Sequence, residues 1–116
     1  MEFAESVGGS ARGNRENAIS KSLEVLGDRW TLLILREAFG GTSRFEGFRE
    51  NLGIARNILS GRLRHLVREG IFERRLYQSH PDRYEYRLTD KGNDLADVLG
   101  SFRRWGDRWM KNGTTE

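Results

Sequence analysis

The stretch that decides the fold runs from Gly53 to Gly70 and has the sequence GIARNILSGRLRHLVREG. Its apolar residues recur at intervals of three and four, so at 100° per residue they share one face of an α-helix: Leu59, Leu63, Leu66 and Val67. Polar and small residues occupy the opposite side, with Ser60 at the border: Asn57, Gly61, Arg64 and Arg68. The pattern predicts a helix over about residues 55–69 that buries its leucines and presents an arginine-bearing face to the outside.

Two helices are predicted upstream of this stretch. The segment NAISKSLEVLG has apolar residues at helical spacing, namely Ile19, Leu23 and Leu26. We expect Gly27 to end that helix, Asp28 to cap the next one, and Gly40–Gly41 to stop it. The run over residues 30–35 is apolar on nearly all sides, which predicts the central helix of the core.

A third, short helix is predicted over SRFEGFREN, which begins at Ser43. Ser43 is followed three residues later by Glu46, which is a capping-box signature. Phe45, Phe48 and Leu52 line one side of this helix. The tripeptide LGI then turns the chain into the stretch quoted first, and two helices joined by a short glycine-containing turn are typical of a helix-turn-helix.

After Gly70 the sequence period changes from helical to alternating. The segments IFERRLYQ and RYEYRLT alternate apolar and polar residues, and QSHPD between them holds the single proline of the chain, which predicts a β-hairpin. A last long helix is predicted over TDKGNDLADVLGSFRRWGDRWM, with Thr89 as its cap and Asp90 complementing its dipole. The predicted fold class is therefore mainly α with a β-hairpin wing (α+β), a winged helix-turn-helix. We expect this domain over residues 15–111, with a flexible tail over 1–14 and another tail over 112–116.

Composition narrows the function classes. The formal net charge is +3, and residues 43–87 alone carry +4 from ten arginines and six acidic residues, which suits phosphate recognition. Without cysteine the chain has no disulfide or thiolate metal site, and its two histidines cannot complete a metal site alone. No apolar run of membrane-spanning length and no signal peptide is visible, so we expect a cytoplasmic protein. The sequence also lacks a nucleophile elbow, a phosphate loop and a metal-spaced carboxylate cluster, so we expect neither an enzyme nor a cofactor.

The outer face of the 55–69 helix suits the major groove of DNA. The second helix of a helix-turn-helix enters that groove, where arginine pairs with guanine, asparagine with adenine and serine with either. The glycine on this face would allow close approach. We expect these contacts from the helix: Arg56, Asn57, Ser60, Gly61 and Arg64. We expect Ser43 and Arg44 at a phosphate, and a wing over about 76–84 to place His80 and Arg83 on the minor groove or the backbone. For His80 the alternative is a plain exposed loop residue.

Other polar residues of the 55–69 helix have a simpler explanation. We expect Arg62, His65 and Arg68 to be solvated surface residues.

The last predicted helix carries an aromatic stripe that points to dimerisation. A single long helix after a wing extends beyond a small core, and large aromatic stripes on such helices are typical of interfaces. With the first helix packing alongside, the expected dimerisation residues are Ile19, Leu23, Leu95, Val98, Leu99, Phe102, Trp105 and Trp109. A two-fold dimer would present two recognition helices to a palindromic site.

Between about Asn17 and Trp109 the chain closely resembles the HxlR-type winged-helix transcriptional regulators. The resemblance rests on GDRWTLLILR (27–36), RFEGFRENLGIARNILSGRL (44–63), REGIFERR (68–75) and YEYRLTDKG (84–92). It implies dimers, held by the terminal helices, that bind near promoters. Some members sense oxidants through a cysteine just before the first helix, but here that position is Asn17, so thiol-based sensing is excluded for this chain. Other members are thought to bind small molecules at the dimer interface.

Four aromatic residues are candidates to line such an effector pocket, with ordinary core packing as the alternative for each: Trp30, Phe39, Phe102 and Trp105. The sequence thus predicts a dimeric, sequence-specific DNA-binding regulator, a repressor or autoregulator. Two alternatives stay open: a winged helix that binds another protein, and a small-molecule-binding regulator with its effector site at the dimer interface.

Overall fold

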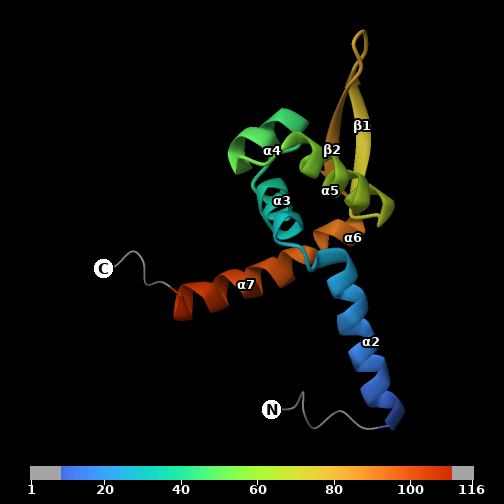
Figure 1. The fold of residues 1–116 in the computed structure, drawn as a ribbon, viewed down its shortest axis with the longest axis vertical. Coiled ribbons are helices and arrows are strands. Elements are labelled where there is room, and N and C mark those ends of the chain that lie inside the picture. The colour runs from blue at the N-terminus through green and yellow to red at the C-terminus, as the bar shows by residue number, and fades with distance from the viewer. Residues whose placement is uncertain (1–8, 111–116) are drawn as a thin grey trace.

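The computed structural model describes residues 9–110, which form a winged helix-turn-helix with two projecting helices (Figure 1). The elements in chain order are α2 (Gly9–Leu26), α3 (Arg29–Phe39), α4 (Phe45–Leu52), α5 (Arg56–Arg68), β1 (Phe72–Gln78), β2 (Arg83–Leu88), α6 (Asp90–Asn93) and α7 (Leu95–Trp109). This order confirms the predicted fold class. None of the helices in this part of the chain is long and apolar enough to cross a lipid bilayer.

Helix α3 is the centre of the core, as its apolar run predicts. It contacts α2, α4, α5 and α7, and its residues Ile34 and Leu35 are fully buried. Asp28 caps this helix by accepting a hydrogen bond from the Thr31 amide at 3.1 Å. The remaining core residues come from the helix-turn-helix and the start of the wing: Phe48, Ile54, Leu59, Leu63, Leu66, Ile71 and Phe72.

The turn between α4 and α5 depends on one glycine. Gly53 ends α4 with φ of 64° and ψ of 32°, and its amide donates to the Arg49 carbonyl at 2.9 Å. This left-handed conformation strains a residue that carries a Cβ, so glycine is favoured there. Ile54, the next residue, is 3% exposed and anchors the turn in the core.

The wing is an antiparallel hairpin in which Phe72 pairs with Leu88 and Arg74 with Tyr86. The register changes between Leu76 and Gln78, so Tyr77 occupies a β-bulge. A third segment lies along the other edge of β2. There Arg44 bridges Glu85, and the Tyr86 amide donates to the Ser43 carbonyl at 2.7 Å. The wing is therefore attached to the segment that leads into α4.

The C-terminal helix is broken, whereas the sequence predicts one continuous helix. Thr89 caps its first part as expected, because its hydroxyl accepts from the Gly92 amide at 3.0 Å. The short α6 ends at Asn93, and α7 starts at Leu95 after a single intervening residue, Asp94. Gly92, Asn93 and Asp94 stand in succession, and all three residue types have low helix propensity. The break lies at this weak point.

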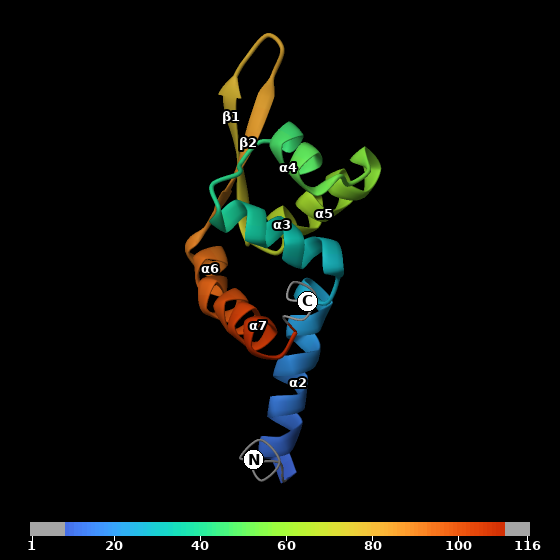
Figure 2. The same cartoon turned by 90° about the vertical axis from the view of Figure 1, so that its left-hand side faces the viewer.

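The first helix is longer than expected. It begins at Gly9, eight residues before the start expected at Asn17, so residues 9–14 of the expected tail are helical. Because nucleation is the costly step, a helix already formed at 17–26 extends through the good helix formers Ala11, Arg12 and Glu16 despite the low helix propensity of Gly13 and Asn14. Residues 1–8 and the expected tail over 112–116 lie outside the described residues. Figure 1 shows α2 and α7 diverging as they leave the domain, whereas in the perpendicular view of Figure 2 α7 runs toward α2 in projection.

Candidate nucleic-acid interface

The two faces of α5 differ as the leucine spacing predicts. Leu59, Leu63 and Leu66 are at most 1% exposed, and burying each such side chain contributes about 1.5–3 kcal/mol. Asn57 and Arg64 are exposed to solvent. Helix α5 is therefore held in the core by its leucines and leaves polar side chains free to meet a ligand.

Ser60 and Gly61 lie beside this polar face and are half-buried. A Cβ built on Gly61 would meet no atom within 4 Å. Packing inside the chain therefore does not require glycine at this position. The position leaves room for the close approach of an external surface.

The start of α5 carries a paired arginine. Arg56 lies 2.9 Å from Glu46 of α4, which also accepts from Arg49 Nε at 2.8 Å. The hydrogen bond from Arg49, followed by the charges of Arg56 and Arg49, lowers the pKa of the Glu46 carboxyl. The Arg56 guanidinium also lies 5.7 Å from the centre of the Phe45 ring. Glu46 and Phe45 thus orient Arg56 beside the exposed face of α5.

The predicted capping box at Ser43 is not formed. Arg44, not Ser43, is the N-cap residue of α4, and its side chain makes no capping hydrogen bond. The expectation fails because Ser43 pairs with β2 through its carbonyl, which keeps the chain extended up to Arg44. Arg44 nevertheless lies where the helix-turn-helix meets the wing, and its guanidinium is 3.9 Å from the centre of the Tyr77 ring.

Arg62 is not the solvated surface residue that its polar surroundings in the sequence predict. It donates to Asp28 from Nε at 2.6 Å and from Nη2 at 3.1 Å, and only 33% of its side chain is exposed. The hydrogen bond from Arg62 is the main cause of the lowered pKa of Asp28. Arg62 is therefore committed to the fold and is unavailable to DNA while this pair persists.

His65 also differs from the expected surface residue. It is half-buried, and its Nε2 lies 3.3 Å from the Val25 carbonyl of α2. Arg68, one turn further along α5 from Arg64, is exposed as expected.

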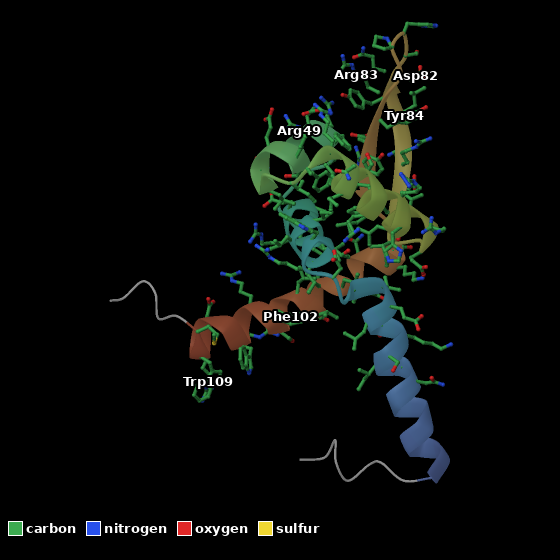
Figure 3. All side chains as sticks on the ribbon, in the orientation of Figure 1. Arg49, Asp82, Arg83, Tyr84, Phe102 and Trp109 are labelled. Carbon is green, nitrogen blue, oxygen red and sulfur yellow. The ribbon has the colours of Figure 1, made fainter. Side chains whose placement is uncertain are left out.

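The wing tip stands apart from the helices. Figure 3 shows Asp82, Arg83 and Tyr84 at the far end of the hairpin, on the opposite side of the molecule from Phe102 and Trp109. His80 has φ of 57° in the turn, and His80 and Arg83 are both exposed. The two wing residues expected at DNA are thus accessible.

The expected dimerisation residues fall into two groups. Leu95 and Leu99 pack against the core of their own chain. The other six expose 40–62% of their surface: Ile19, Leu23, Val98, Phe102, Trp105 and Trp109. Helix α7 has no fully buried residue, so its outer part is an apolar surface without a partner among the described residues.

The expected effector-pocket residues are only partly brought together. Phe39 and Phe102 share a groove of about 620 Å³ between α3 and α7. Trp30 instead packs against the core, and Trp105 lies further along α7, outside this groove. Arg36 and Arg103 are also among the lining residues of the groove.

Three residues near this interface escaped sequence reasoning. Glu46, predicted as part of a capping box, instead holds two arginines. Tyr77 and Tyr84 of the hairpin each have an arginine over the ring, Arg44 and Arg74 respectively. The tyrosine spacing within the hairpin was the available signal, but the partners depend on strand register.

Comparison with known proteins finds helix-turn-helix regulators. A family model described as HxlR-like helix-turn-helix matches residues 25–114. Rv3095 of Mycobacterium tuberculosis, named an uncharacterized HTH-type transcriptional regulator, is 50% identical over 93 residues, which are 80% of this chain and 59% of that protein. This chain thus spans about three fifths of the length of its mycobacterial relative. YvaP of Bacillus subtilis, with the same type of name, is 36% identical over 78% of this chain and 84% of its own length.

Among solved structures, PA1607, titled a putative transcription factor, superposes with a TM-score of 0.71 at 37% identity. The match covers 95% of this chain and 70% of that one.

Proposed function

The chain belongs to the HxlR-like helix-turn-helix family, and from this premise we propose that it binds double-stranded DNA as a homodimer and represses transcription or regulates its own gene. The domain described here is the winged helix-turn-helix of a transcriptional regulator. The proposal places α5 in the major groove, the wing on the minor groove or the backbone, and the protein in the cytoplasm with the chromosome.

The division of α5 into a fully buried and a fully polar face carries this proposal. The leucines fix the helix in the domain, while Asn57 and Arg64 stand exposed with side chains that match adenine and guanine edges. Arg56, paired with Glu46, stands at the start of α5, and Arg44 lies over the Tyr77 ring of the wing. Such an arrangement provides base contacts in the centre and phosphate contacts at the sides.

The dimer is supported by the apolar surface of α2 and α7. Phe102, Trp105 and Trp109 expose 58%, 59% and 62% of their surface, although each is a residue type that normally seeks burial. An isologous contact between two copies would cover these side chains. It would also set two copies of α5 at a fixed separation, as a palindromic operator requires.

The test is a titration of the protein against a DNA fragment selected from genomic sequence and against a scrambled fragment, at several salt concentrations. We expect tighter binding to the selected fragment and a steep decrease of log affinity with log salt, about 0.9 per phosphate contact. Binding without salt dependence would contradict the proposal and favour the protein-interaction alternative.

A second candidate role is supported by the groove between α3 and α7. Phe39 and Phe102 provide apolar contact. Arg36 and Arg103 provide guanidinium groups that could exchange their ion-pair partners, Glu37 at 3.3 Å and Asp107 at 3.7 Å, for the carboxylate of a small aromatic acid. Such a ligand would touch both the central core helix and the dimerisation helix. A thermal-shift screen of small aromatic carboxylates tests this role, with Arg36→Ala and Arg103→Ala expected to remove any shift.

A further inference from the structure

We propose that Arg44 and Arg74 form a two-sided phosphate clamp on the wing, each with its guanidinium over a tyrosine ring on its own face of the hairpin. The clamp deepens the proposed DNA-binding function and rests on it. It assigns to the stem of the wing, not only to its tip, a contact with each of the two DNA strands that border a groove.

Strand register places Arg74 on the inner face of the wing. Residues that pair across an antiparallel ladder have their side chains on the same face, and this face alternates along each strand. Phe72 is buried against Phe48 and Tyr86, with ring centres 6.2 and 6.3 Å apart, so its face is the inner one. Arg74 pairs with Tyr86 and shares that face. Its guanidinium lies 4.0 Å from the centre of the Tyr84 ring.

The same register places Arg44 on the outer face. Arg44 bridges Glu85, which pairs with Arg75 on the face opposite Arg74. The guanidinium of Arg44 lies 3.9 Å from the centre of the Tyr77 ring. Tyr77 is the bulge residue, and bulges commonly redirect a side chain. The bulge thus supplies the ring that holds Arg44.

The two stacks lie at one level of the hairpin. Tyr84 pairs with Leu76, the neighbour of Tyr77, so both rings belong to adjacent positions above the buried base of the wing. One cation therefore projects from each face at the same height. A hairpin with this arrangement fits between two rows of phosphates better than it fits along a single row.

Both arginines are also available to phosphate. Neither Arg44 nor Arg74 forms an ion pair with any residue of the described part of the chain, and both are exposed. The neighbouring arginines of the wing are ion-paired instead, because Arg75 lies 3.8 Å from Glu73 and Arg87 lies 3.2 Å from Glu85. A guanidinium stacked on a ring keeps its planar N–H donors free for a phosphate and has already lost part of its side-chain mobility.

The first experiment measures DNA affinity against salt for Arg44→Ala, Arg74→Ala and the double variant. We expect each single change to weaken binding to all sequences alike and to flatten the salt slope by about one unit per protomer, with the two effects adding. Arg75→Ala is the matched control, because it removes a charge from the same hairpin that Glu73 already balances, and its slope should change by less than half as much.

The second experiment assigns each arginine to a strand. Neutral methylphosphonate linkages replace the phosphates beside the wing on one DNA strand or on the other. We expect the DNA affinity of Arg74→Ala to be unaffected when the phosphates of one strand are neutralised. The affinity of Arg44→Ala should be unaffected when those of the opposite strand are neutralised. If both variants lose sensitivity to the same strand, the two-sided clamp is wrong.

The tyrosines are positioning residues and have their own test. Tyr77→Phe and Tyr84→Phe should retain wild-type affinity, since the ring remains, whereas Tyr77→Leu and Tyr84→Leu should weaken binding severalfold with the salt slope unchanged. Melting curves verify folding of every variant. If wild-type binding is steeply salt-dependent but Arg74→Ala leaves the slope intact, the clamp fails and the proposed function stands. If the wild-type protein shows no salt-dependent binding, the proposed function itself fails.

Discussion

Arg62, in the middle of α5, holds Asp28 at the start of α3 through two nitrogen–oxygen contacts of 2.6 and 3.1 Å. The same carboxylate accepts from the Thr31 amide and so caps α3. The Asp28 side chain therefore caps the central helix α3 and, through Arg62, also fixes how α5 lies across α3. The pair links residues that are 34 positions apart in the sequence.

Substitutions at Asp28 should separate its two roles. Asp28→Asn retains a good cap but removes the charge, and we expect a loss of about 0.5–1 kcal/mol in the free energy of unfolding, because the pair is partly exposed. Asp28→Ala also removes the cap and should lower the free energy of unfolding by a further 0.5–2 kcal/mol, roughly the range typical of such caps. Urea denaturation measures both. Arg36→Ala is the control, since the Arg36 side chain is 60% exposed in its ion pair with Glu37 and its removal should cost little.

The contribution of Asp28 should depend on pH in a defined direction. Because Arg62 lowers the pKa of this carboxyl in the folded state, the folded protein binds the proton less readily than the unfolded chain. The stabilisation is therefore complete above the unfolded pKa, about 4, and is lost as pH falls through the lower folded pKa. The difference in unfolding free energy between wild type and Asp28→Asn should be constant from pH 7 to 5 and shrink toward pH 3. A difference that does not change over this range would show that the ion pair is not the cause.

Arg64 should contribute to base recognition. We expect Arg64→Ala to cost about 1–3 kcal/mol of binding to the preferred DNA and to relax the preference at one base pair per half-site. Arg68→Ala is the matched control, as it lies one turn later on the same exposed side and beyond the N-terminal half of α5 that meets base edges. Titrations against specific and scrambled DNA measure both variants. Equal losses for the two changes would mean that α5 contributes only general charge.

The apolar stripe of α7 should hold the dimer. Phe102→Asp combined with Trp109→Asp places charge on two side chains that are more than half exposed, so each chain should stay folded while two copies separate. We expect monomers by light scattering, with a cooperative melting transition retained. Asp107→Lys alters charge on the opposite side of the helix and should leave the dimer intact. A dimer that survives the double change would place the interface elsewhere.

Local sequence patterns predict much of this fold because they act within one element. The spacing of Leu59, Leu63 and Leu66 identifies both the helix and its buried face, since helix geometry alone determines which side chains lie together. Asp28 and Thr89 cap the helices that follow them, as their residue types and positions indicate. These features need no knowledge of the rest of the chain.

The features that escaped prediction depend on contacts between distant segments. Ser43 has the local signature of a cap, but pairing with β2 gives its backbone another partner. Arg62 resembles a solvated residue until Asp28 is brought beside it by packing of α3 on α5. The stacks of Arg44 and Arg74 likewise follow from a bulge and a register that the alternating pattern of the strands does not specify.

The bulge at Tyr77 also bears on how such a wing can evolve. Strand positions below the bulge alternate between the two faces of the hairpin, so a residue gained or lost there would exchange the faces of the residues down to Phe72. Beyond the bulge only Gln78 and Arg83 pair before the turn. Insertions or deletions in the loop over residues 79–82 would change the reach of the wing without disturbing Arg74 or the core. The hairpin is thus a fixed stem with a variable tip, so the reach of the wing can change from one descendant of this sequence to the next while the stem and the core stay the same.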